Sequence, residues 1–182
     1  MDPGVWLSFF LLFLAGGLTP GPAVLLVTAS SIRYGVGAAL LPAVGICLAN
    51  LLWLALALTG AAALAHAFPA GFAALKIVGV AFILVLAARM AFGPPVSLEQ
   101  REPPPRARLL ATGVALQLLN PNALVYFGVA TPGFIDASRD LAVQAGILAV
   151  TVTLCEMFGL MVYAAGAEAL AQRFRSGAFA RW

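Results

Sequence analysis

Three long runs without a charged residue constrain this chain more than any other feature. Residues 3–32, 34–75 and 109–135 contain no Asp, Glu, Lys or Arg. A helix needs about 20 apolar residues to cross a bilayer, whereas a membrane β-strand needs only about 9–11. The runs also lack the alternating pattern of barrel strands. The sequence therefore predicts an all-α polytopic membrane protein.

The scarcity of charge excludes a soluble domain. Charged residues make up 9% of the chain, against about 25% in an average soluble protein. The ten basic residues are few and lie beside apolar spans, which argues against a nucleic-acid partner. We expect the lipid bilayer to surround most of the chain.

Five transmembrane helices can be placed along the sequence. Residues 93–108 form a polar, Pro-rich stretch that we expect to be a cytoplasmic linker. The whole chain, residues 1–182, is then a single transmembrane domain, with a first three-helix repeat over 1–92 and a second, incomplete repeat over 109–182. The expected spans are 5–31, 38–65, 71–92, 109–131 and 141–170.

The basic residues are distributed unequally between the two sides of the expected membrane. Eight of the ten fall on one side: Arg33, Arg89, Arg101, Arg106, Arg108, Arg173, Arg175 and Arg181. The other side holds Arg139, and also Lys76 if that residue is interfacial. Lys and Arg near span ends are retained in the cytoplasm. We therefore expect the N-terminus outside and the tail at Trp182 in the cytoplasm.

Helix breakers interrupt the first and fourth spans near their centres. The motifs are Thr19-Pro20-Gly21-Pro22 and Asn120-Pro121-Asn122. Thr or Asn followed by Pro is typical of a fresh helix start, with Thr19 and Asn120 as N-caps and Pro20 and Pro121 as first residues. At membrane depth, the freed backbone groups must face protein or a water-filled cavity. A helix start there favours an anion such as a carboxylate, although a simple proline kink is an alternative interpretation.

The two breaks also predict an internal repeat. Pro20 and Pro121 lie 101 residues apart, in spans one and four. Three spans per repeat invert the second copy, which is a common transporter plan with the binding site at the midplane. The sixth helix of such a 3+3 arrangement is missing before Trp182. The chain is then truncated, works with five spans, or packs against another protomer in a possible homodimer.

Two charged residues fall within expected spans. Glu156 lies near the centre of the fifth span and Lys76 lies a few residues into the third. An intramembrane carboxyl group is costly and is a functional candidate, here for the amino group of a substrate or a coupling proton. A neutral structural carboxyl group is the alternative. Lys76 is a candidate for pairing with Glu156, for binding a substrate carboxylate, or for extending to the outer interface.

The sequence offers no catalytic or metal-binding motif. Its single histidine, His66, lies outside the expected spans, so neither a His-based triad nor a His-based metal site can be built. We expect no enzymatic activity, no metal and no cofactor. Cys47 and Cys155 lie in apolar runs, where buried thiols are the simplest interpretation. A membrane thiol–disulfide carrier and a non-transporting membrane subunit or channel are the two alternatives to a transporter.

Several segments resemble the LysE/RhtB family of amino-acid exporters. Residues 18–23 (LTPGPA) are similar to the first-helix signature of that family, and 75–82 (LKIVGVAF) to the start of its third helix. Residues 113–134, with LNPNA and TPGF, resemble its fourth-helix block. The family usually has Lys where this chain has Asn122, and it usually has a sixth helix.

The resemblance implies an inner-membrane exporter of amino acids or related small zwitterions, driven by the proton-motive force. We expect Thr19 to Pro22 and Asn120 to Asn122 to form the site, with Lys76 supplementing them and Glu156 as the coupling residue. Alternating access would rock one repeat against the other.

Overall fold

The computed structural model describes residues 1–59, 101–136 and 138–175, with a few single positions between 70 and 92. Every regular element in these ranges is helical, which confirms the all-α fold class. Most of the expected third span, including Lys76, and residues 93–100 of the linker lie outside the described residues.

Within the described part of the chain, two helices are each long and apolar enough to cross a membrane: α3 (Val36–Leu58) and α8 (Leu141–Arg175). They correspond to the expected second and fifth spans. The helices α1 (Pro3–Leu18) and α2 (Pro22–Tyr34) together form a third span with a 50° bend.

The fourth expected span is bent in the same way. It begins with α6 (Arg106–Leu118) and continues after a 54° bend through α7 (Pro121–Ala123). A π-helical segment, Leu124–Ala130, and a 3-10 turn, Thr131–Phe134, complete it. The prediction that the first and fourth spans are broken is therefore confirmed.

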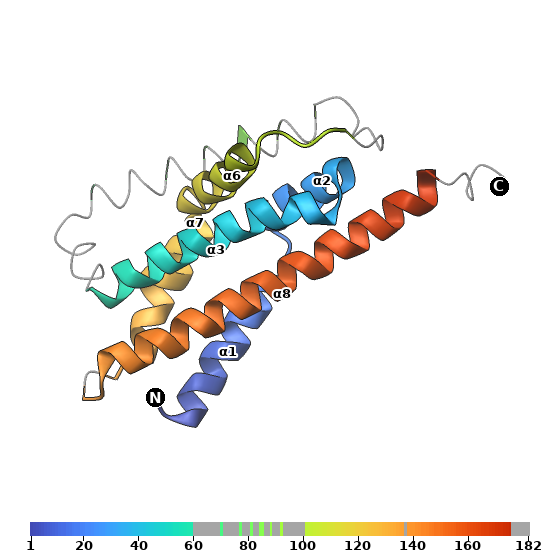
Figure 1. Cartoon of the computed structure of the whole chain (residues 1–182). Helices are drawn as coiled ribbons and strands as arrows, with labels where there is room; N and C mark the ends of the chain where they lie inside the picture. The colour runs from blue at the N-terminus through green and yellow to red at the C-terminus, as the bar shows by residue number, and fades with distance from the viewer. Residues whose placement is uncertain are drawn as a thin grey trace.

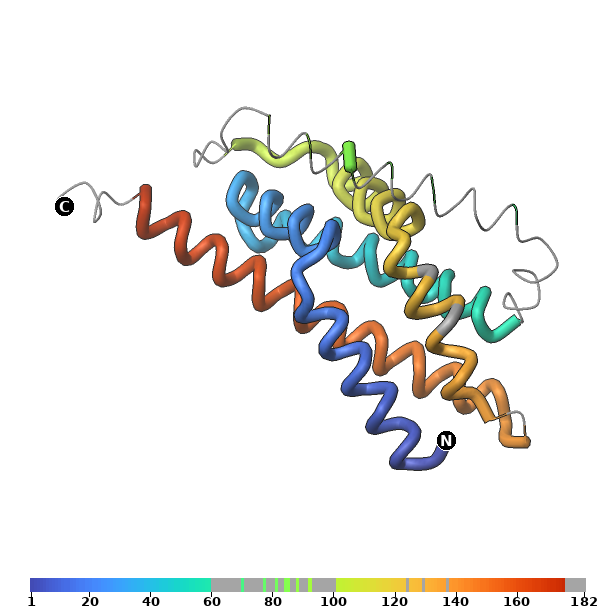
Figure 2. The backbone as a smooth tube through the Cα atoms, turned by 180° about the vertical axis from the view of Figure 1, so that it is seen from behind, coloured from blue at the N-terminus to red at the C-terminus, as the bar shows by residue number. Residues whose placement is uncertain are grey.

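The long helix α8 packs against three other helices of the bundle. It contacts α1, α2 and α3, and α3 in turn contacts α6 (Figure 1). The half-helix α1 and the segment after the second break descend together toward the end of the bundle that holds the N-terminus (Figure 2). The two breaks therefore lie partway along the same bundle.

Among the described residues, buried apolar side chains form two separate clusters, and each described span contributes to both. The cluster nearer the N-terminal end comprises Phe9, Phe13, Leu54, Ala57, Ala123, Phe127, Leu148, Val152 and Cys155. The cluster at the opposite end comprises Ala23, Val24, Val27, Ala39, Ala43, Ile46, Leu116, Leu160 and Ala164. Between the two clusters, each described span carries polar, glycine or proline residues among apolar ones: Gly16, Gly17, Thr19 to Pro22, Asn50, Gln117, Asn120 to Asn122, Glu156 and Gly159. These residues, here called the polar layer, thus separate the two apolar clusters.

Glycines allow the helices to approach closely around this layer. A Cβ atom on Gly113 of α6 would lie 2.1 Å from the Pro42 carbonyl oxygen of α3. A Cβ on Gly159 of α8 would lie 2.2 Å from the Gly17 oxygen of α1. Small residues let backbones meet in membrane bundles, where lipid removes the hydrophobic drive for helices to associate.

The bundle end opposite the N-terminus is closed by contacts to the α2–α3 turn. Gly35 provides this turn with φ of +85°, a conformation that favours glycine. Glu168 of α8 accepts a hydrogen bond from the Val36 N–H, and the Arg175 guanidinium donates to the Ile32 oxygen at 2.6 Å. The Arg101 N–H donates to the Arg33 oxygen at 2.8 Å. Three basic segments therefore meet at this end.

The glycine contacts lead to a stability prediction. Gly159→Ala places a methyl group against the α1 backbone, and overpacking of this kind costs about 1–3 kcal/mol. Gly166→Ala on the same helix is the matched control, because nothing lies within 4 Å of its Cβ position. After heating in detergent, size-exclusion chromatography should show a lower melting temperature for Gly159→Ala only. Equal melting temperatures for both variants would contradict the close approach of α1 and α8.

Candidate functional site

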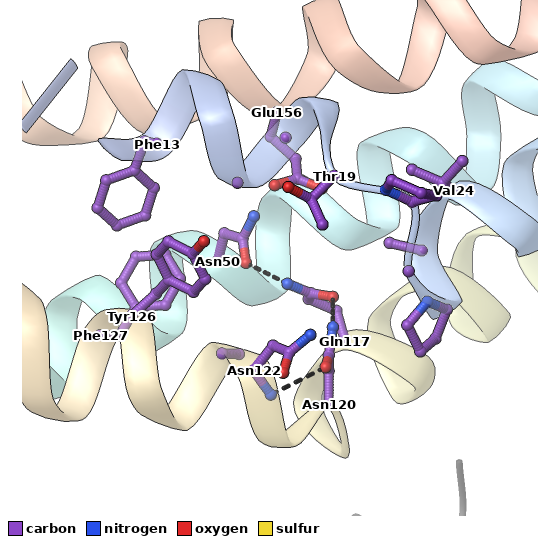
Figure 3. A pocket seen from close by; sticks show the side chains of 17 residues that line it. Phe13, Thr19, Val24, Asn50, Gln117, Asn120, Asn122, Tyr126, Phe127 and Glu156 are labelled. Atoms are coloured by element: carbon purple, nitrogen blue, oxygen red, sulfur yellow. Dashed lines mark hydrogen bonds between the residues drawn. The ribbon is translucent and has the colours of Figure 1, made fainter. Parts of the chain in front are cut away.

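A cavity of about 90 Å³ lies in the polar layer between the two breaks (Figure 3). One water needs roughly 10–15 Å³ of such space, so the cavity has room for a small molecule or several waters. It brings together predicted site residues from three spans. Those that line it are Thr19, Pro20, Gly21, Pro22, Asn120, Asn122 and Glu156.

The first break differs from its prediction in register. Thr19 is not the N-cap of a new helix: it ends α1, and its hydroxyl donates to the Ala15 oxygen at 2.7 Å. The new helix begins at Pro22 rather than Pro20, with Gly21 as the N-cap. The cause is the second proline, because the residue before a proline is disfavoured in the helical conformation. Gly21 is accordingly extended, with φ −145° and ψ −172°.

This register leaves the N-terminus of α2 facing the cavity. No side chain caps Gly21, and Ala23 and Val24 of the first turn line the cavity. The first N–H groups of a helix have no partner within it, and the helix dipole adds positive potential at this end. A 13-residue helix thus offers the cavity a site for an anion.

The second break confirms its predicted helix start. Asn120 precedes Pro121, and its side-chain oxygen accepts a hydrogen bond from the Asn122 N–H at 3.1 Å. Pro121 begins the new segment and does not itself line the cavity. The two breaks are therefore capped differently, one by an amide side chain and the other by none.

A chain of buried amides links the second break to α3. The Asn120 amide donates to the Gln117 side-chain oxygen at 2.9 Å, and Gln117 donates to the Asn50 oxygen at 2.7 Å. The exposed fractions of Asn50, Gln117 and Asn120 are 1%, 5% and 6%. Asn50 and Gln117 therefore form a hydrogen bond between two helices and also line the cavity.

Glu156 enters the cavity from α8 and meets the amide chain at its α3 end. Its side chain interacts with that of Asn50, whose amide nitrogen is directed toward it (Figure 3). Among the lining residues that the structure describes, Glu156 alone has a charged side chain. The cavity therefore presents an anion-binding helix end and a carboxyl group within one small volume.

Aromatic residues that sequence reasoning missed form one end of the cavity. Phe13 of α1 lies 5.5 Å from Tyr126 and 5.3 Å from Phe127 between ring centroids. A signal did exist in the sequence, because Phe13 and Phe127 lie at similar distances from the prolines of the two breaks. Residues of this kind are usually taken as packing residues when no partner across the bundle is known.

The described residues contain no group of three or more His, Cys, Asp or Glu side chains that could hold a metal ion. Cys47 and Cys155 are buried free thiols, and neither lines the cavity. Thr112, a polar residue of α6 outside the cavity, is exposed, and its hydroxyl donates to the Arg108 oxygen.

Comparison with known proteins gives a consistent result. The family model described as LysE type translocator matches residues 14–182. A Vibrio cholerae protein named only as a membrane protein is 28% identical over 170 residues, covering 91% of this chain and 83% of the relative. No solved structure matches the chain.

Two further relatives carry a functional name. The leucine efflux protein of Klebsiella pneumoniae is 28% identical over 167 residues, covering 84% of this chain and 77% of the relative. The leucine efflux protein of Enterobacter sp. is 30% identical over 141 residues, covering 75% and 67%.

The amide chain leads to a prediction about the polar layer. Gln117→Leu leaves the Asn50 oxygen and the Asn120 amide without their partner, and each such buried group costs about 1–3 kcal/mol. Thr112→Val on the same helix is the control, since it removes one exposed hydrogen bond. The melting temperature in detergent should fall clearly for Gln117→Leu and little for Thr112→Val. A fall of the same size in both would contradict a structural role for the amide chain.

Proposed function

The chain belongs to the family of LysE type translocators, and on that premise we propose that it exports amino acids or related small zwitterions across the inner membrane. The observation that carries the proposal is the cavity, where a helix N-terminus and the Glu156 carboxyl group face the same space. Two relatives are named leucine efflux proteins, which supports a substrate of this class. Such a protein moves its substrate without changing it chemically.

The cavity matches the two charges of an amino acid. The substrate carboxylate binds the free N–H groups of Ala23 and Val24 at the start of α2. The amino group faces Glu156 and the side-chain oxygens of the second break. Lys76 remains a predicted supplement to the carboxylate site.

Transport requires the cavity to open to each side in turn. The two apolar clusters are candidates for the two gates, because each closes the polar layer from one end of the bundle. We propose that the helix segments move about the two breaks, as halves of an inverted repeat, in alternating access. Export is then driven by the proton-motive force, with Glu156 carrying the coupling proton. A homodimer stays a prediction from the sequence.

The two ends of the bundle support the proposed orientation. Arg33, Arg101 and Arg175 meet at one end through the contacts to the α2–α3 turn. At the other end, Met1 packs against the same apolar cluster as Phe134 and Ile135. The positive-inside rule supports a cytoplasmic location for the basic end and a periplasmic location for the N-terminus.

Glu156→Gln tests the proposed roles of the carboxyl group. The amide keeps the size of the side chain but can neither carry a proton nor hold a negative charge. In vesicles containing the purified protein, leucine transport driven by a pH gradient should be lost. Glu102→Gln, an exposed position outside the cavity, is the control and should leave transport unchanged.

Exchange of labelled for unlabelled leucine without a gradient separates the two roles of Glu156. Loss of exchange as well as driven transport indicates that the carboxyl group binds the substrate, whereas exchange that persists indicates proton coupling alone. Unchanged driven transport by Glu156→Gln would overturn the assignment of this residue.

Cysteine labelling tests the orientation. In a background with both native cysteines replaced by serine, Ser138→Cys and Glu102→Cys place single exposed thiols at opposite ends of the bundle. A membrane-impermeant maleimide added to intact cells should label Ser138→Cys only. Labelling of Glu102→Cys from outside would reverse the proposed topology.

A further inference from the structure

The aromatic end of the cavity is a rigid surface. Phe13 and Phe127 are 6% and 2% exposed, and both belong to the apolar cluster at the N-terminal end. Phe13 also packs against Phe9 at 4.4 Å, which in turn meets Phe134 edge-on at 5.3 Å. While this end of the bundle is closed, rings packed on several sides form a wall that limits the size of a bound molecule.

Tyr126 is the most exposed of the three cavity-lining rings, and its position is fixed by α1. A Cβ atom on Gly16 would lie 3.0 Å from the Cε1, Cζ and Oη atoms of Tyr126. The ring therefore lies directly against the backbone of α1, in the space that the missing side chain leaves. The Thr131 hydroxyl donates to the Tyr126 carbonyl oxygen at 2.8 Å and holds the π-helical segment that carries the ring.

The three rings lie at the far end of the cavity from the anion-binding helix. In Figure 3, Phe13, Tyr126 and Phe127 gather at one end, Val24 of α2 lies at the other, and Glu156 lies between them. An amino acid with its carboxylate at α2 and its amino group at Glu156 has its side chain directed toward the rings. Aromatic faces at this end complement an uncharged, apolar side chain.

We propose that Phe13, Tyr126 and Phe127 form the side-chain subsite of the transporter and that Tyr126 sets its depth. This inference rests on the proposed export of amino acids. It assigns the substrates to neutral amino acids with aliphatic side chains of about the size of leucine. A larger side chain such as that of phenylalanine meets the fixed ring of Tyr126 and is excluded.

The test is the ratio of leucine to phenylalanine transport, measured as exchange in vesicles with the purified protein. The ratio does not depend on how much active protein each preparation contains. We expect Tyr126→Ala to lower it about tenfold, since a few methylene groups in an apolar pocket discriminate by this order. Tyr126→Phe keeps the ring and should leave the ratio within about twofold of the original. This change is much smaller than the change in substrate preference that one methylene group causes.

Two further variants keep the result interpretable. Phe134→Leu alters the same aromatic cluster but does not line the cavity, so its ratio should be unchanged. Tyr126→Leu is a second, less drastic truncation, and it should shift the ratio in the same direction if Tyr126→Ala does not insert into the membrane. If the ratio stays constant in every Tyr126 variant that transports leucine, the proposed subsite is wrong. The proposed export of amino acids is not affected by that result. If the unaltered protein exchanges no amino acid, the proposed function itself fails.

Discussion

The structure depends on one constraint: backbone polar groups at membrane depth must find partners within the protein. Two proline motifs break the helical hydrogen bonding near the middle of the first and fourth spans. At the second break, Asn120 caps the new helix and continues into a chain of buried amides through Gln117 to Asn50. At the first break, no side chain caps α2, and the space beside its N-terminus is the cavity. The N–H groups at the start of α2 are therefore the backbone groups for which a ligand can best supply hydrogen-bond acceptors.

The same constraint explains why the polar residues form a layer. Each described span carries polar, glycine or proline residues between its contributions to the two apolar clusters, and these residues meet at the cavity. The layer holds the single charged side chain among the described residues that line the cavity, Glu156, and the apolar clusters separate it from both ends of the bundle. An arrangement of this kind suits a small zwitterion, because both of its charges meet complementary groups and its side chain meets aromatic rings. Membership of a translocator family and a polar cavity between two apolar clusters point to the same activity.

Much of the fold was predictable from the sequence because membrane spans leave a direct trace in the spacing of charges. The broken spans, the helix start at Asn120 and the position of Glu156 at the cavity follow from proline, asparagine and carboxyl groups within apolar runs. The register at Thr19 was wrong because the second proline, Pro22, restricts Gly21 and delays the helix. The positions of Asn50, Gln117 and Tyr126 at the cavity could not be predicted, because they depend on which residues of distant spans lie opposite one another. The close glycine contacts depend in the same way on how the helices cross.

The central claim is that the cavity recognises both charged groups of an amino acid, and equilibrium binding tests it most directly. Radiolabelled leucine is dialysed against the purified protein in detergent, with unlabelled leucine, leucinamide or 4-methyl-2-oxopentanoate as competitors. Leucinamide lacks the carboxylate and the oxo acid lacks the amino group, while both keep the side chain. The account predicts that leucine displaces the label and that both analogues compete poorly. Equal competition by either analogue would contradict recognition of the zwitterion by the α2 N-terminus and Glu156.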